Sequence, residues 1–298
     1  DILWGIKHDV DFMAISFVQD ASDMVKVRKI IEDNDGNIQL FAKIEKFDAA
    51  QNIDSILKES DGIMVARGDL GIEIPYYEVP ALQKKLIKKA NQASKPVITA
   101  TQMLLSLTTN ETATRAEISD IANAVLDGTD AVMLSEESAI GQYPLVAVQT
   151  MVKTIEGAEK IYPFNKFSTF TMHDSTDSIN EAAVRLCQDI DGWGLVVLSS
   201  SGIAVKKLSR YRPLRDIYAV VNNPKVAKLL TICWGVSPAF LVKEGSLSEM
   251  MSEAMKQGLG SNIDKSYILT GRDPGSVTGT TNTIRILQKD EMDFFRSL

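Results

Sequence analysis

A regular alternation of short apolar runs and longer amphipathic stretches constrains the fold most strongly. The apolar runs in the first half are 12–18 (FMAISFV), 38–44 (IQLFAKI), 62–66, 95–100 and 130–135. Each run is apolar on both faces, as a parallel strand covered by helices must be. The stretches between them, such as 22–34 and 114–128, have the apolar spacing of helices. The sequence therefore predicts five consecutive βα units.

These units have a nearly constant length. The landmark residues Ser16, Lys43, Gly68, Thr101 and Ser135 follow one another at intervals of 27, 25, 33 and 34 residues. A closed (β/α)₈ barrel needs eight strands and roughly 250 residues. Five units therefore predict a parallel sheet or a partial (β/α)₈ TIM barrel, with its first and last strands as open edges.

A second α/β series follows a polar segment at 165–176. Its predicted strands are 194–198, 216–221, 237–242, 265–271 and 282–287, and helical patterns occupy 177–189, 202–210, 224–231 and 246–257. No helix separates the last two strands, which predicts an antiparallel edge. We expect an α/β protein with a partial barrel over residues 1–160 and a smaller α/β sheet domain over residues 161–298.

Composition excludes several classes of protein. The chain has 298 residues, 45% of them hydrophobic, and a net charge of −7, so nucleic acid is not an expected partner. No apolar run approaches the roughly 18 residues that span a bilayer, and no leader is recognised. The two cysteines, Cys187 and Cys233, predict reduced thiols in a cytoplasmic protein. The chain begins at Asp1 rather than Met, as a fragment would.

Charged side chains follow the second and third strands. Lys43 and Glu45 alternate to the same face at the end of one strand, and Asp69 follows the next strand within Arg67-Gly68-Asp69. Because neighbouring strands lie about 4.8 Å apart, the two carboxylates can share one hard divalent cation, Mg²⁺ or Mn²⁺. An ordinary ion pair and a turn are the alternatives.

Hydroxyl groups follow the fourth and fifth strands. Thr99 and Thr101 are predicted to share a face, and a hydroxyl there can contact a substrate oxygen or relay a proton. Satisfying local backbone groups is the alternative role. Ser135 and Glu137 add a hydroxyl and a carboxylate at the same rim.

Several long segments together resemble the pyruvate kinase family. They are FAKIE, GIMVARGDLGIEIP, KPVITATQML, TRAEISDIANAVLDGTDAVMLSEESAIGQYP and the late GTTN segment. The resemblance implies a TIM barrel from its fourth strand onward, followed by an α/β regulatory domain. It also implies the glycolytic transfer of a phosphoryl group from phosphoenolpyruvate to ADP, giving pyruvate and ATP.

The resemblance implies specific site residues. Lys43 matches the lysine that stabilises the transferring phosphoryl group, and Glu45 and Asp69 match the carboxylates that hold the divalent metal. Gly68 and Asp69 match the loop that binds the substrate carboxylate through backbone N–H groups. Thr101 matches the threonine that touches substrate and is implicated in enol protonation.

Other matches are supporting residues. Arg67 matches an arginine beside the site, and Ser135 and Glu137 match a serine and a glutamate of the family's SGET pattern. Glu136 stands where that pattern has glycine. In the second domain, the resemblance implies an effector phosphate site, aided by 275–281, at Ser199, Ser200, Ser201 and Gly202. N-capping is the alternative, and Ile203 and Ala204 replace an arginine and a serine or threonine of the common motif.

The family's first three barrel strands and its lid domain have no counterpart in this sequence. They carry phosphate contacts, much of the nucleotide site and the K⁺ ligands. We therefore expect an incomplete active site, negligible kinase activity of this chain alone and, by resemblance, a homotetramer. A metal-dependent aldolase of the citrate-lyase type and a non-catalytic regulatory or assembly module are the alternatives.

Overall fold

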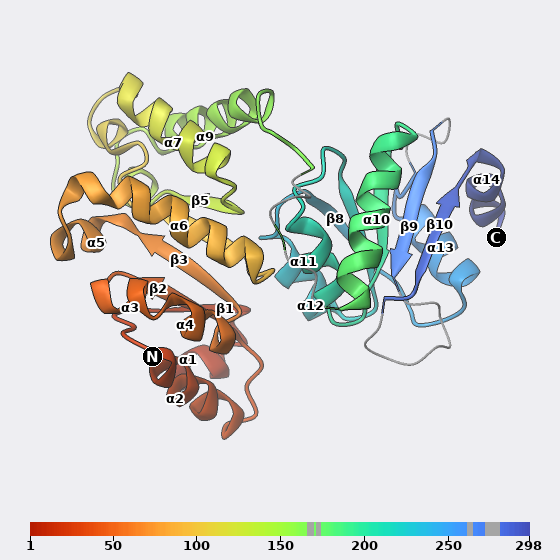
Figure 1. Ribbon diagram of the computed structural model, residues 1–298, viewed down its shortest axis with the longest axis horizontal. Helices are drawn as coiled ribbons and strands as arrows, with labels where there is room; N and C mark the ends of the chain where they lie inside the picture. Colours follow the sequence, from red (N-terminus) through yellow and green to blue (C-terminus); the bar gives the residue numbers. More distant parts are fainter. Residues whose placement is uncertain (166–169, 171–173, 261–264, 272–280) are drawn as a thin grey trace. The chain divides into compact units, whose positions relative to one another are not determined.

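The chain folds into two units, each with its own sheet (Figure 1). The computed structural model describes residues 1–165, 170, 174–260, 265–271 and 281–298. Unit 1 is Asp1–Pro163 and unit 2 is Phe164–Leu298.

Unit 1 alternates strands and helices as the periodicity predicts. Its strands are β1 (Phe12–Ile15), β2 (Gln39–Ile44), β3 (Gly62–Ala66), β4 (Val97–Ala100) and β5 (Ala131–Met133). Its helices are α1 (Ile2–Lys7), α2 (Ala21–Glu32), α3 (Phe47–Gln51), α4 (Ile53–Glu59), α5 (Arg67–Glu73), α6 (Val79–Gln92), α7 (Arg115–Asp127), α8 (Glu136–Ala139) and α9 (Pro144–Glu159), with short 3₁₀ turns η1 (Tyr76–Glu78) and η2 (Leu105–Thr108).

The sheet of unit 1 is parallel, with the strand order β1-β2-β3-β4-β5. Alternate strand residues such as Leu40, Ala42 and Ile44 pack against helices in a fully buried core. Since all five strands run the same way, their carboxyl ends lie along one edge, and the residues after them form a single rim. The predicted α/β fold with five consecutive βα units is confirmed.

Local signals in the sequence fix the ends of α7. The Thr114 hydroxyl caps the helix by accepting from the Glu117 N–H, and the Glu117 carboxylate accepts from the Thr114 N–H. The helix ends at Gly128, whose φ of 95° lies in the left-handed region that favours glycine.

Unit 2 is a sheet of five strands in the order β10-β9-β6-β7-β8, and β9 and β10 are antiparallel as predicted. The strands are β6 (Gly194–Leu198), β7 (Ile217–Val221), β8 (Val236–Leu241), β9 (Tyr267–Gly271) and β10 (Thr283–Leu287). The helices are α10 (Ser175–Asp189), α11 (Ile203–Ser209), α12 (Pro224–Leu230), α13 (Leu247–Lys256) and α14 (Lys289–Ser297).

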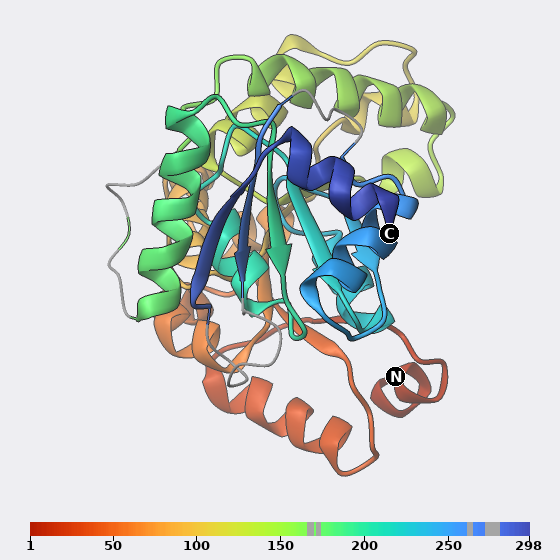
Figure 2. The same ribbon diagram turned by 90° about the vertical axis from the view of Figure 1, so that its right-hand side faces the viewer.

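Helices cover both faces of this second sheet (Figure 2). Leu195 and Val197 of β6 pack with α10, α11 and α12, whereas Val196 and Leu198 pack with α13 and α14. Helix α14 was not predicted from the sequence. No helix among the described residues has the length and apolar character needed to cross a membrane.

Candidate active site at the strand ends of unit 1

Lys43 and Glu45 lie together where β2 ends. The Glu45 carboxylate is only 1% exposed, and its Oε1 lies 2.5 Å from Lys43 Nζ. Its Oε2 accepts the Phe17 backbone N–H at 2.7 Å. Lys43 also donates to the Ser16 hydroxyl at 2.9 Å, so the loop after β1 and the end of β2 are joined. The predicted alternation of Lys43 and Glu45 to one face agrees with this ion pair.

Gly68 and Asp69 lie in a helix rather than in the expected loop. They occupy the first turn of α5, which follows β3 directly. The Asp69 side chain is exposed and has no hydrogen-bond or ion-pair partner among the described residues. Its carboxylate is therefore available to a ligand.

Thr101 follows β4 with an unusual backbone conformation. Its φ is 72° and that of Gln102 is 54°, which turns the chain sharply away from the strand. The Thr101 hydroxyl accepts the Gly68 N–H at 2.8 Å and donates to the Ala100 carbonyl at 2.7 Å. Thr99 is fully buried and donates to the Thr129 hydroxyl instead, so the turn separates the two threonines that were predicted to share a face.

The Arg67 guanidinium joins the start of α5 to the end of β4 and to α7. It donates to the carbonyls of Ala100 at 3.2 Å and Thr101 at 2.6 Å. Its Nη1 contacts both oxygens of Asp120, at 2.7 and 2.6 Å. Arg67 thus holds the Thr101 backbone, in agreement with a supporting position beside the site.

Glu137 supports the same loop from the other side. It is 1% exposed, accepts the Leu104 N–H at 3.0 Å and accepts the Ser135 N–H at 2.8 Å. Ser135 precedes α8 as its N-terminal boundary residue. Glu137 therefore connects Ser135 with the segment that follows Thr101. Glu136, in the position of the family's glycine, is an exposed residue of α8.

Two of these side chains are of the ligand type that a hard divalent cation prefers. Two carboxylates, Glu45 and Asp69, follow neighbouring strands, and the Lys43 ammonium forms an ion pair with Glu45. No group of three or more acidic, histidine or cysteine ligands forms among the residues described. Mg²⁺ commonly binds one or two carboxylates and completes its shell with water and substrate oxygens, so two protein ligands are sufficient.

Sequence reasoning missed Lys46, Glu73 and Asp120. Lys46 directly follows Glu45 and contacts Glu73 at 2.6 Å. For Lys46, its place in the sequence next to the predicted metal ligand Glu45 could have pointed to a role at the site. Glu73 carried no such signal. Asp120 lies 53 residues from Arg67 in the sequence, and no local pattern connects the two.

Comparison with known proteins places this geometry in one family. Residues 1–148 match the family described as "Pyruvate kinase, barrel domain", and residues 177–287 match "Pyruvate kinase, alpha/beta domain". The chain belongs to the pyruvate kinase family.

Individual relatives are similar over nearly the whole chain. A pyruvate kinase of Clostridium acetobutylicum is 41% identical over 96% of this chain and 62% of its own length. One of Staphylococcus epidermidis is 45% identical over 96% of this chain and 50% of its own length. The crystal structure of a pyruvate kinase from Cryptosporidium parvum superposes with a TM-score of 0.89 at 34% identity, covering 96% of this chain and 60% of that one. The chain thus spans between half and two-thirds of the pyruvate kinases it matches.

The predicted effector loop lies between β6 and α11. The Gly202 N–H donates to the Ser199 hydroxyl at 2.9 Å, and Gly202 has a φ of 79°. Ser200 and Ser201 continue the same turn. Residues 275–280 of the second predicted loop lie outside the described residues. An effector site here stays a prediction.

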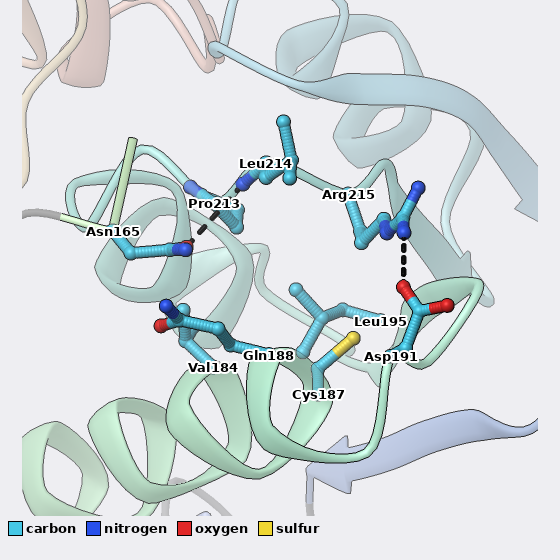
Figure 3. Close-up of a pocket in the computed structure, with 9 residues that line it drawn as sticks. All are labelled: Asn165, Val184, Cys187, Gln188, Asp191, Leu195, Pro213, Leu214 and Arg215. Carbon is cyan, nitrogen blue, oxygen red and sulfur yellow. Dashed lines mark hydrogen bonds and ion pairs between the residues drawn. The ribbon is translucent and has the colours of Figure 1, made fainter. Parts of the chain in front are cut away.

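A small cavity in unit 2 has no counterpart in the predictions (Figure 3). It measures about 50 Å³, and apolar side chains and the Cys187 thiol face it. Burial raises the pKa of this thiol to about 11, so it stays protonated near neutral pH and is a poor nucleophile. At the polar end Arg215 pairs with Asp191 at 2.5 Å. The raised pKa is what is expected of a buried thiol that packs as part of the core.

Proposed function

We propose that this chain supplies the metal-binding and enol-protonating part of a pyruvate kinase active site. The supporting observation is the convergence of the Lys43–Glu45 pair and the Gly68–Thr101 hydrogen bond at adjacent strand ends. In the proposed reaction, the phosphoryl group leaves the enol oxygen of phosphoenolpyruvate and bonds to a terminal oxygen of ADP. The resulting enolate then takes a proton at its methylene carbon and becomes pyruvate.

Lys43 is proposed to stabilise the phosphoryl group in transfer. Its ammonium is a compact point charge on a flexible stem, suited to the charge that develops on phosphoryl oxygens. The side chain is 24% exposed, and Ser16 and Glu45 fix its position. Positioning of this kind supplies much of the rate in phosphoryl transfer.

Glu45 and Asp69 are proposed to hold Mg²⁺ or Mn²⁺. When bound, a divalent cation would stabilise negative charge on the substrate's carboxylate and enolate oxygens. Gly68 and Asp69 are proposed to face the substrate carboxylate with the first turn of α5. Thr101 is proposed to relay the proton to the enol, since the hydroxyl lies at this edge and is held by Gly68.

A partial reaction tests this proposal on the chain as it exists. Pyruvate in D₂O loses its methyl protons when it enolises, and proton NMR follows that loss. With Mg²⁺ present, we expect exchange faster than with Mg²⁺ alone, and a decrease of about tenfold or more in Asp69→Asn and in Thr101→Val. ATP formation from phosphoenolpyruvate and ADP should be negligible, because nucleotide and phosphate contacts of the family are not in this sequence.

The outcome separates the remaining alternatives. Exchange no faster than with Mg²⁺ alone, in a chain that is folded by circular dichroism, would favour a non-catalytic module. Family membership already argues against the aldolase. Kinase turnover at ordinary rates would contradict the expectation of an incomplete site.

Assembly and surroundings are proposed by family resemblance. We propose a cytoplasmic protein that binds phosphoenolpyruvate or pyruvate and ADP or ATP, uses K⁺ through ligands outside this sequence, and forms a homo-oligomer, a tetramer in the family. Two buried free cysteines are compatible with a reducing compartment.

A further inference from the structure

Lys46 directly follows the candidate metal ligand Glu45 and forms an ion pair with Glu73 of α5, the helix that carries Asp69. Its ammonium contacts Glu73 Oε1 at 2.6 Å, and both side chains are about one-third exposed, at 35% and 32%. Glu73 is the last residue of α5, four residues after Asp69. Because residues i and i+4 lie on one helix face, the Glu73 contact brings Lys46 to the face of α5 that carries Asp69.

A second set of contacts ties Lys46 to Glu45. The Lys46 ammonium lies 5.9 Å from the centre of the Phe17 ring. Phe17 donates its backbone N–H to Glu45 Oε2 at 2.7 Å. The ammonium is therefore placed between the loop that holds Glu45 and the helix that holds Asp69.

The electrostatics agree with this placement. The hydrogen bond and charge of Glu73 are the largest causes that raise the pKa of Lys46, and the charges of Glu45 and Asp69 raise it further. The two contacts of Lys46, with Glu73 and with the Phe17 ring, thus place a positive charge near the candidate metal ligands, and Glu73 offsets that charge.

We propose that Lys46 sets the strength of divalent-cation binding at Glu45 and Asp69, as a fixed positive charge that Glu73 holds beside the two carboxylates. This inference rests on the metal site of the proposed function. A like charge beside the site opposes an incoming cation, and Glu73 partly cancels that opposition. The affinity of the site would then depend on the Lys46–Glu73 pair as well as on the ligands.

Mn²⁺ binding to the full chain tests the proposal. Electron paramagnetic resonance measures free Mn²⁺, and broadening of amide NMR signals at Gly68 and Asp69 locates the bound ion. Removing the charge with Lys46→Met should tighten Mn²⁺ binding about threefold to tenfold. Glu73→Gln removes the negative charge that offsets the Lys46 ammonium, and it should weaken Mn²⁺ binding by about the same factor. The double variant should return to within about twofold of the wild type.

Matched controls separate charge from folding. Lys46→Arg keeps the charge and should bind Mn²⁺ within about twofold of the wild type. Lys58→Met removes an exposed lysine at the C-terminal end of α4. This variant should also bind Mn²⁺ within about twofold of the wild type. The effect of Lys46→Met should shrink when ionic strength rises from about 20 mM to about 500 mM, because salt screens exposed charges.

The possible failures are distinguishable. If Asp69→Asn abolishes Mn²⁺ binding but Lys46→Met matches Lys58→Met, the role of Lys46 is overturned and the metal site stands. If Asp69→Asn leaves Mn²⁺ binding unchanged, or if the wild type shows no saturable binding, the metal site and the role of Lys46 both fail.

Discussion

At the scale of single residues, Arg67 connects several segments near the candidate site. It is 13% exposed at its side chain and joins the Thr101 carbonyl to Asp120 of α7. A guanidinium suits this role because its donors point in several fixed directions. The left-handed backbone at Thr101 thus has a specific support, since such conformations persist only where surrounding contacts hold them.

We expect Asp120→Asn to lower the free energy of unfolding by about 1–2 kcal/mol, because Arg67 would lose its charged partner while remaining mostly buried. The Asp120 side chain is 38% exposed, and solvent reduces the effect accordingly. Urea unfolding measures it. Asp54→Asn is the control, since its pair with Lys89 is 70% exposed at Asp54; a loss as large in the control would contradict the argument.

Glu117 is a residue whose contribution depends on pH. Burial acts to raise its pKa, but hydrogen bonds from Ser106 and Thr114 outweigh burial and lower the pKa below the ordinary value of 4.5. The native carboxylate therefore stabilises the fold above pH 4.5, and this stabilisation is lost as pH falls through the lowered native pKa.

Glu117→Gln should lower the free energy of unfolding by about 1 kcal/mol at pH 7, because an amide oxygen cannot accept all of these bonds. The gap between wild type and variant should narrow as pH falls below 4.5. Urea unfolding across that range measures both. Glu156→Gln, at an exposed position of α9, should change little, and a gap that stays constant with pH would refute the assignment.

At the scale of elements, close packing between β2 and β3 depends on Gly62. Gly62 pairs with Phe41, and a Cβ at Gly62 would lie 2.3 Å from the Phe41 ring. We expect Gly62→Ala to lower the free energy of unfolding by about 1–3 kcal/mol through this overlap. Gly157→Ala in α9, where a Cβ meets nothing within 4 Å, should instead stabilise by about 0.5–1 kcal/mol. Thermal or urea unfolding of the pair checks both signs.

The elements also show what the sequence could predict. Each strand core was predictable because a parallel strand buried on both faces is a continuous apolar run. Lys43 and Glu45 were placed together correctly by strand alternation alone. Helix α14 was missed because acidic and basic residues dominate KDEMDFFRS, and α5 because glycines in RGDLGIE predict a turn. The Thr101 turn and the Arg67–Asp120 pair depend on tertiary contacts, which no local pattern contains.

At the scale of the whole molecule, the strands of the first sheet lie in the same order as in the sequence, whereas those of the second sheet do not. In unit 1 every strand pairs with the strand before it in the sequence. In unit 2 the central strand β6 also pairs with β9, as at Val196 and Leu269. Contacts between distant segments cost more chain entropy to close than contacts between neighbours.

This difference has a consequence during synthesis on the ribosome. In unit 1 each strand after β1 can pair as soon as it is synthesised, because the strand it pairs with has been synthesised just before it. In unit 2, one side of β6 has no strand partner until β9 has been synthesised. An unpaired strand edge therefore stays open for longer in unit 2 than in unit 1, and such edges are prone to wrong pairing.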